Sequence, residues 1–155
     1  MNRRFGTSSP PSNAAARELV RKLIDDRTTS VGAPADARVV ASAGDFLYRE
    51  LSRWVGHDGC HAVFTRVLSD TRDDHPALAH VQFRTRTHPY IEGASEAVRA
   101  HGDPATGAAL EAVLVRVIEL VGRLIGDDMA TRLIERSRDV AGLPDVYPHL
   151  KREEA

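Results

Sequence analysis

Two histidines and the only cysteine of the chain stand close enough together to suggest metal binding. His57 and His61 are four positions apart, so both would lie on one side of a helix, with Cys60 between them. Imidazole and thiolate are ligands that a soft metal accepts. A structural zinc site takes four ligands, however, and no second pair of this kind stands at suitable spacing. The simpler interpretation is that Cys60 is a small core residue and that the histidines flank the start of a helix near solvent.

A single histidine on an apolar helix face can also hold haem. His101 continues the helical spacing of Ile91, Ala94 and Val98 and is therefore a candidate ligand. It stands one residue before Gly102, where the helix dipole favours a histidine without any ligand. No glutamate is followed by a histidine three residues later, which argues against a ferritin-like di-iron site.

Basic residues stand at every second position in one segment just after the middle of the chain. Arg84, Arg86 and His88 would project on one side of an extended segment and could bind a phosphate, a carboxylate or an acidic partner protein. The alternative is a solvated edge strand, because arginines on such an edge prevent aggregation between sheets.

Other chemistries find little support in the residues. The chain has no Gly-x-Ser-x-Gly elbow, phosphate loop, dinucleotide fingerprint or His-Glu-x-x-His motif, so nothing indicates an enzyme. The segment around Gly56 resembles a DNA-binding helix-turn-helix in its spacing, but a histidine follows the glycine where an apolar residue is expected. Asp58 and Asp70 would also repel phosphates. We therefore expect no cofactor and no nucleic acid.

Composition describes an ordinary globular chain. Its 155 residues carry a formal charge of −1, which provides no bulk attraction to nucleic acid or anionic lipid. One cysteine forms no internal disulfide, and charges interrupt the most apolar run, 108–125. Arginine far outnumbers lysine, a bias typical of GC-rich coding. We expect a bacterial, cytoplasmic protein without a transmembrane helix.

Apolar spacing predicts an all-α bundle of five or six helices, with at most one short strand segment near 81–87. The first helix (14–26) would be an arm that packs on this chain or on a partner. The second would begin at Ser42 with Phe46, Leu47, Leu51, Trp54 and Val55 as its apolar positions. No internal repeat of fixed period is evident. The expected parts are a flexible tail (1–12), an amphipathic helical arm and linker (13–41), the bundle (42–140) and a loose tail (141–155).

Prolines and an aspartate indicate where the later helices start. Pro89 suits the first turn of one helix, and Asp103 is expected to be the N-cap of the longest helix, which Pro104 begins. A last helix would follow Gly126 and end near Arg138.

The longest helix has a wider apolar face than its own chain is expected to cover. Leu114, Ile118, Val121 and Ile125 lie on one side and a second set of apolar residues on the other, so the pattern predicts a homodimer. A central helix wrapped by its own chain is the alternative. The leading hypothesis is thus a non-enzymatic regulatory or adaptor module that acts through protein contacts, followed by a ligand, haem or metal sensor and then by a DNA-binding regulator. The predicted interface residues are Val113, Val117, Leu120 and Leu124.

Overall fold

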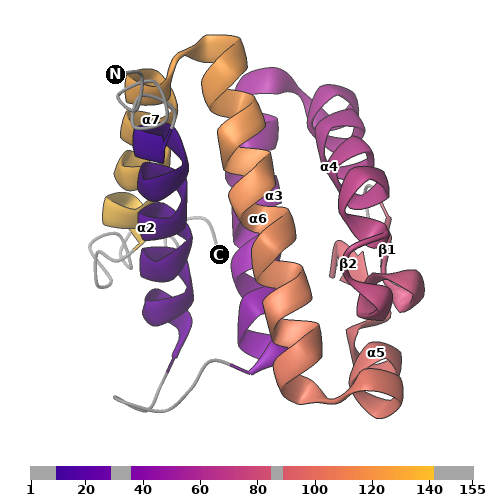
Figure 1. Ribbon diagram of the computed structural model, residues 1–155. Helices are drawn as coiled ribbons and strands as arrows, with labels where there is room; N and C mark the ends of the chain where they lie inside the picture. The colour runs from indigo at the N-terminus through magenta and orange to yellow at the C-terminus, as the bar shows by residue number, and fades with distance from the viewer. Residues whose placement is uncertain (1–9, 29–35, 85–88, 142–155) are drawn as a thin grey trace, which may run out of the picture.

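The computed structural model describes residues 10–28, 36–84 and 89–141, which form an all-α bundle (Figure 1). The described part contains six α-helices, one 3-10 helix and one pair of two-residue strands, so the predicted fold class is confirmed. In chain order the elements are α2 (Pro10–Arg27), α3 (Ala37–Val55), α4 (His57–Arg72), η1 (Pro76–His80), β1 (Gln82–Phe83), β2 (Ile91–Glu92), α5 (Ala94–His101), α6 (Asp103–Ile125) and α7 (Asp127–Ala141).

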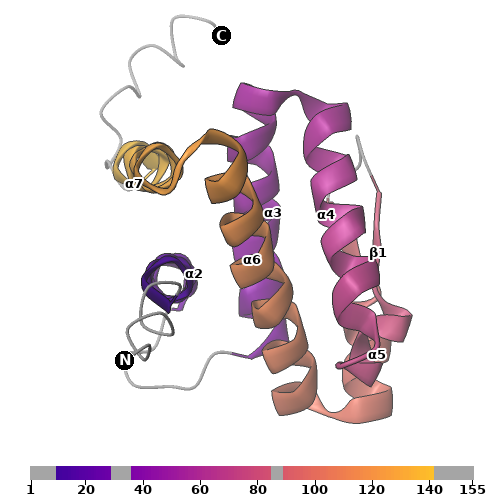
Figure 2. The same ribbon diagram turned by 45° about the horizontal axis from the view of Figure 1, so that its top comes forward.

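Helices α3 and α6 form the centre of the bundle. They lie side by side and run in the same direction, with α4 on one flank and the pair α2 and α7 on the other (Figures 1 and 2). The β1–β2 pair, η1 and α5 pack near the far end of α4. One continuous core joins these layers, and its largest fully buried side chains include Leu23, Leu47, Phe64, Leu78, Leu110, Leu114 and Ile134.

Single glycines turn the chain at three helix junctions, at positions 56, 102 and 126. At Gly56 the backbone N–H donates to the carbonyl of Ser52 in the helix before it (2.9 Å), and the carbonyl accepts from the N–H of Cys60 in the next helix (3.0 Å). The other two junctions repeat this arrangement. Gly56 has φ 85° and ψ 157°, a conformation that essentially only glycine adopts. One residue therefore ends one helix and starts the next, which makes each corner tight.

Two aspartates cap the start of α3. Asp36 accepts a hydrogen bond from the Val39 N–H, and Asp103 accepts one from the Ala37 N–H, both at 2.9 Å. The predicted start at Ser42 is wrong, because these acceptors let the helix begin at Ala37. The expected boundary between arm and bundle at 41/42 consequently falls inside α3.

The expected role of Asp103 also needs correction. The residue before α6 is Gly102, and no side chain of the described residues caps that helix, whereas the Asp103 carboxylate accepts a hydrogen bond from α3 instead. The sequence-based prediction assumed that the Asp103 carboxylate accepts a hydrogen bond from the helix at whose start it stands. The fold instead uses the first residue of one helix to satisfy the backbone of another.

The short strands replace part of an expected helix. Residues 91–92 pair antiparallel with 82–83, with Phe83 opposite Ile91, so α5 begins at Ala94 and not near Pro89. The Asp45 carboxylate also accepts from the Ile91 N–H (3.1 Å), which fixes the second strand against α3. Residues 85–87 of the predicted strand lie outside the described residues.

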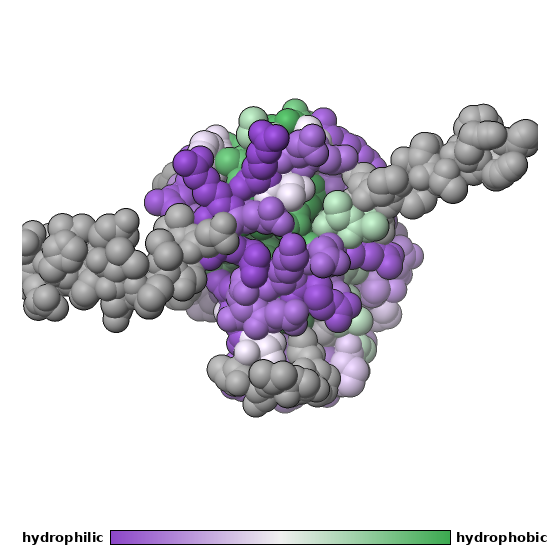
Figure 3. Space-filling view, turned by 90° about the vertical axis from the view of Figure 1, so that its left-hand side faces the viewer, coloured by the Kyte–Doolittle hydropathy of each residue, from purple (hydrophilic) through white to green (hydrophobic). Residues whose placement is uncertain are grey.

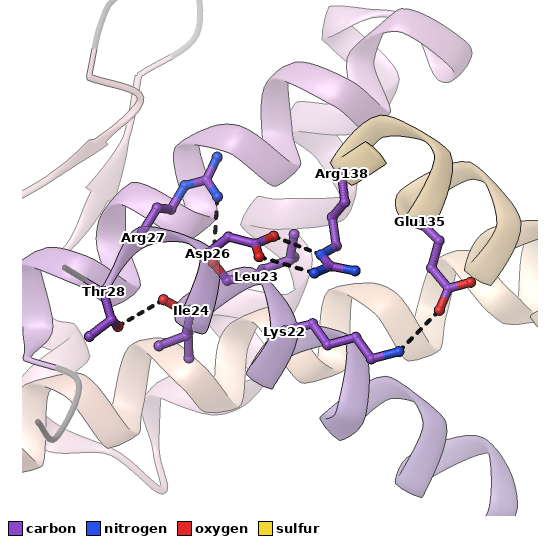
Figure 4. Close-up of polar contacts among 8 residues, drawn as sticks. All are labelled: Lys22, Leu23, Ile24, Asp26, Arg27, Thr28, Glu135 and Arg138. Atoms are coloured by element: carbon purple, nitrogen blue, oxygen red, sulfur yellow. Dashed lines mark hydrogen bonds and ion pairs between the residues drawn. The ribbon is translucent and has the colours of Figure 1, made fainter. Parts of the chain in front are cut away.

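The first helix packs on its own chain. Its apolar face, with Leu19, Leu23 and others, is buried against α6 and α3. Its polar side meets α7, where Arg138 donates two hydrogen bonds to the Asp26 carboxylate (2.7 and 3.0 Å; Figure 4). Lys22 reaches Glu135 at 3.3 Å in the same view. None of the described helices has a stretch both long and apolar enough to span a membrane.

Candidate functional site

The three candidate metal ligands each contact a different group. The His57 Nδ1 lies 3.3 Å from the Tyr48 hydroxyl, and the His61 Nδ1 lies 2.9 Å from the Tyr90 hydroxyl. The buried Cys60 thiol donates to the Tyr48 carbonyl at 3.6 Å, and burial raises its pKa from 9.0 to about 12. It is therefore protonated at neutral pH. Among the described residues no group of three or more His, Cys, Asp or Glu side chains is arranged to hold a metal ion.

The tyrosines that bind these histidines belong to an aromatic cluster in the core. The Tyr48 and Tyr90 rings stack with centroids 3.6 Å apart, and Phe83 also stacks on Tyr90, with centroids 5.0 Å apart. Phe64 meets the Tyr90 ring edge-on at 5.5 Å. Burial raises the pKa of Tyr90, and the nearby Tyr48 adds to this rise, so its hydroxyl stays neutral. Each histidine is therefore the hydrogen-bond partner of the hydroxyl group of a buried tyrosine.

The other candidate ligands also lie outside any common site. His101 is exposed at the end of α5, with its ring 5.3 Å from that of His80, and so does not continue an apolar stripe into the core. Arg84 pairs with Glu92 across the short strands at 2.9 Å. Arg86 and His88 lie outside the described residues.

A hollow of about 510 Å³ lies between the start of α3 and α5. It has the volume of a small-molecule pocket. Its three carboxylates, Asp36, Asp45 and Asp103, each accept a backbone N–H of this chain. These carboxylates therefore take part in the hydrogen bonds that hold the fold together, and Arg38, Ser42, Ser95 and Arg99 are the other polar residues that line the hollow.

The four residues of the predicted interface separate into two groups. Val113 and Val117 are buried in this chain's own core, with Val117 at 0% exposure, because α2, α3, α4 and α7 all pack on α6. Those two valines cannot contact a second copy, so the alternative of a wrapped central helix holds for them. Leu120 is half-buried against the core, whereas Leu124 is 66% exposed.

Large exposed apolar side chains gather at one end of the bundle. Among the residues whose side chains the structure describes there are five of them, and all lie close to Gly56 or Gly126, the corners where α3 meets α4 and α6 meets α7. Scattered exposed apolar residues are ordinary, but a concentration at one place is a candidate interaction surface. We call this surface the apolar end; it consists of Trp54, Val55, Leu124, Ile125 and Met129.

Figure 3 shows the face made by α2 and α7, where hydrophilic side chains cover most of the surface. Hydrophobic side chains appear in a recess near its middle and along its upper edge, and that edge is the end of the bundle that carries the two corners.

The two corners that form the apolar end match each other. Residues 51–64 and 121–134 show the same succession of buried, intermediate and exposed positions. Residues 53–58 and 123–128 also share one pattern, namely arginine, two apolar residues, glycine, a variable residue and aspartate. This short internal repeat is absent from the sequence-based expectation. Since α3 and α6 run in the same direction, it brings both apolar pairs to the same end.

A small apolar hollow lies between the corners. Its volume is about 170 Å³, and both central helices and α4 contribute to its wall. An aliphatic or aromatic side chain from a partner would fill a space of this size and composition. The lining residues are Leu51, Val55, Gly59, Cys60, Val63, Val121, Leu124 and Ile125.

Sequence reasoning identified Leu124 but missed most of this surface. Trp54 and Val55 were expected among the apolar positions of the second helix, yet Trp54 is 57% exposed. The available signal was an apolar pair directly before a helix-ending glycine, where the last turn extends beyond its neighbours. No protein-family model, curated protein or solved structure matches the chain, so the geometry of this end carries the inference of function.

Proposed function

We propose that this protein is a non-enzymatic regulatory or adaptor module that binds protein through the apolar end. The observation that carries the proposal is the gathering of all five large exposed apolar side chains of the described residues at two matched corners. Apolar side chains around a small hollow, with charged residues beside them, are typical of a protein interface with a buried centre and a polar rim.

The homodimer expected from the sequence remains part of this proposal, with a different interface. Because Val113 and Val117 are buried, two copies would meet through Leu124 and the rest of the apolar end. The sensor hypothesis has less support, since His57, Cys60 and His61 already bind tyrosine hydroxyls or backbone.

Site-specific crosslinking tests the binding role whatever the identity of the partner. A photoreactive amino acid replaces Met129, which is exposed at the apolar end, and a matched variant carries it at Arg99 on α5, at the opposite end of the molecule. Both variants are irradiated in the cells from which the sequence comes, and the adducts are identified by mass spectrometry.

We expect the probe at position 129 to give a discrete protein adduct, either with this chain or with another, that the probe at position 99 does not give. If both positions give the same adducts, or neither gives any, the apolar end is not a protein-binding surface and the proposal is wrong.

A further inference from the structure

Two histidines from different elements meet at the end of the molecule opposite the apolar end. His80 is the last residue of η1 and His101 the last residue of α5, and these two elements pack on each other. The ring centroids lie 5.3 Å apart, with the ring planes inclined at 59°. Both residues are exposed, and in the described part of the chain neither imidazole forms a hydrogen bond or an ion pair. Their ring nitrogens are therefore available to a ligand.

The backbone on both sides holds the two histidines in place. His80 directly precedes Val81, which is fully buried in the core. Gly93, just before α5, lies so close to the His80 carbonyl oxygen that a Cβ at this position would collide with it. Directly after His101, the Gly102 N–H donates to a carbonyl of α5 at 2.8 Å and ends the helix. Only side-chain rotation is left to change the distance between the two rings.

The separation of the rings matches that of two imidazoles bound to one metal ion. Imidazole nitrogens bind Zn²⁺ at about 2.0–2.1 Å, and two such ligands at a tetrahedral angle place their ring centroids roughly 5 Å apart. The observed distance of 5.3 Å agrees with this value. Because both rings are exposed, each can turn about its side-chain bonds and direct a nitrogen to the point between them.

We propose that His80 and His101 together bind one divalent transition-metal ion that prefers imidazole, such as Zn²⁺. The proposal goes beyond the proposed function, because the pair lies at the other end of the molecule and shares no residue with the apolar end. Among the described residues no third His, Cys, Asp or Glu joins the pair. Water therefore completes the coordination, and the ion is exchangeable, unlike the ion of a closed structural site.

A zinc titration of the full chain, purified without a histidine tag, tests the proposal by calorimetry. We expect one ion per chain. His80→Gln and His101→Gln should each weaken zinc binding by roughly tenfold or more, because the remaining imidazole has lost its chelating partner. The double variant should bind little more weakly than either single variant, since the two ligands act as a unit.

A third histidine provides the matched control. His75 directly precedes η1, and His75→Gln removes the same kind of side chain but should leave the zinc affinity unchanged. Circular dichroism confirms that the variants are folded. In the wild type, NMR should show zinc-dependent shifts of the imidazole resonances of His80 and His101 but not of His57 and His61, which already contact tyrosine hydroxyls.

Three results would overturn the proposed metal site. The first is a wild-type protein that binds no zinc at high micromolar concentration. The second is zinc binding that both single variants retain in full. The third is an equal loss of affinity in His75→Gln, which is the behaviour of an ion held by scattered surface histidines. None of these results bears on the apolar end, which the crosslinking at Met129 tests separately.

Discussion

At the scale of single residues, the side chains that were candidates for metal binding or reactivity make structural contacts in this fold. Cys60, His57 and His61 make hydrogen bonds to the two stacked tyrosines, and burial raises the pKa of the Cys60 thiol to about 12. The contacts of these three residues depend on Tyr48 and Tyr90, which come from distant parts of the chain and belong to no recognisable motif.

Asp103 also has a structural role, and substitution of this residue tests that role. Asp103→Ala removes the acceptor for the Ala37 N–H and should lower the free energy of unfolding by about 1 kcal/mol. Asp103→Asn keeps an acceptor oxygen and should cost clearly less. Urea denaturation of both variants measures the difference. Equal stability of the alanine variant and the wild type would show that this hydrogen bond does not help to start α3.

At the scale of elements, apolar spacing was sufficient to predict the helices but not their ends. The long helix ends at Ile125 as expected, because Gly126 follows it. The start of α3 was misplaced because its local N-cap, Asp36, was not recognised, and its second acceptor, Asp103, lies far along the chain. Periodicity also cannot tell that a last helical turn projects past its neighbours, which is why Trp54 was assigned to an apolar face that the chain covers.

The corner at Gly56 gives a prediction at the scale of elements, and Gly59, three residues later, provides the control. Gly56→Ala forces a Cβ into a backbone conformation that disfavours it and should cost about 1–3 kcal/mol. Gly59 lies inside α4 with only ordinary contacts around a new Cβ, so Gly59→Ala should stabilise the protein by about 0.5–1 kcal/mol. Thermal or urea unfolding compares the two. Similar effects of both substitutions would contradict the role assigned to the corner.

At the scale of the whole molecule, the parallel course of α3 and α6 explains the position of the apolar end. It places two matched corners at one end, and their apolar residues remain exposed because no further layer of the described chain covers them. Of the residues expected at an interface, Leu124 is exposed, whereas Val113 and Val117 are buried because α2, α3, α4 and α7 of this chain pack on α6.

The most direct test uses Trp54, the single tryptophan of the chain, which lies in the apolar end. Its emission maximum and its quenching by acrylamide are followed from nanomolar to high micromolar protein, alongside the mass by light scattering. We predict that the emission moves to shorter wavelength and quenching falls as the mass doubles from 17.0 kDa. Emission from an exposed indole at every concentration, together with the mass of one chain, would contradict the proposed dimer.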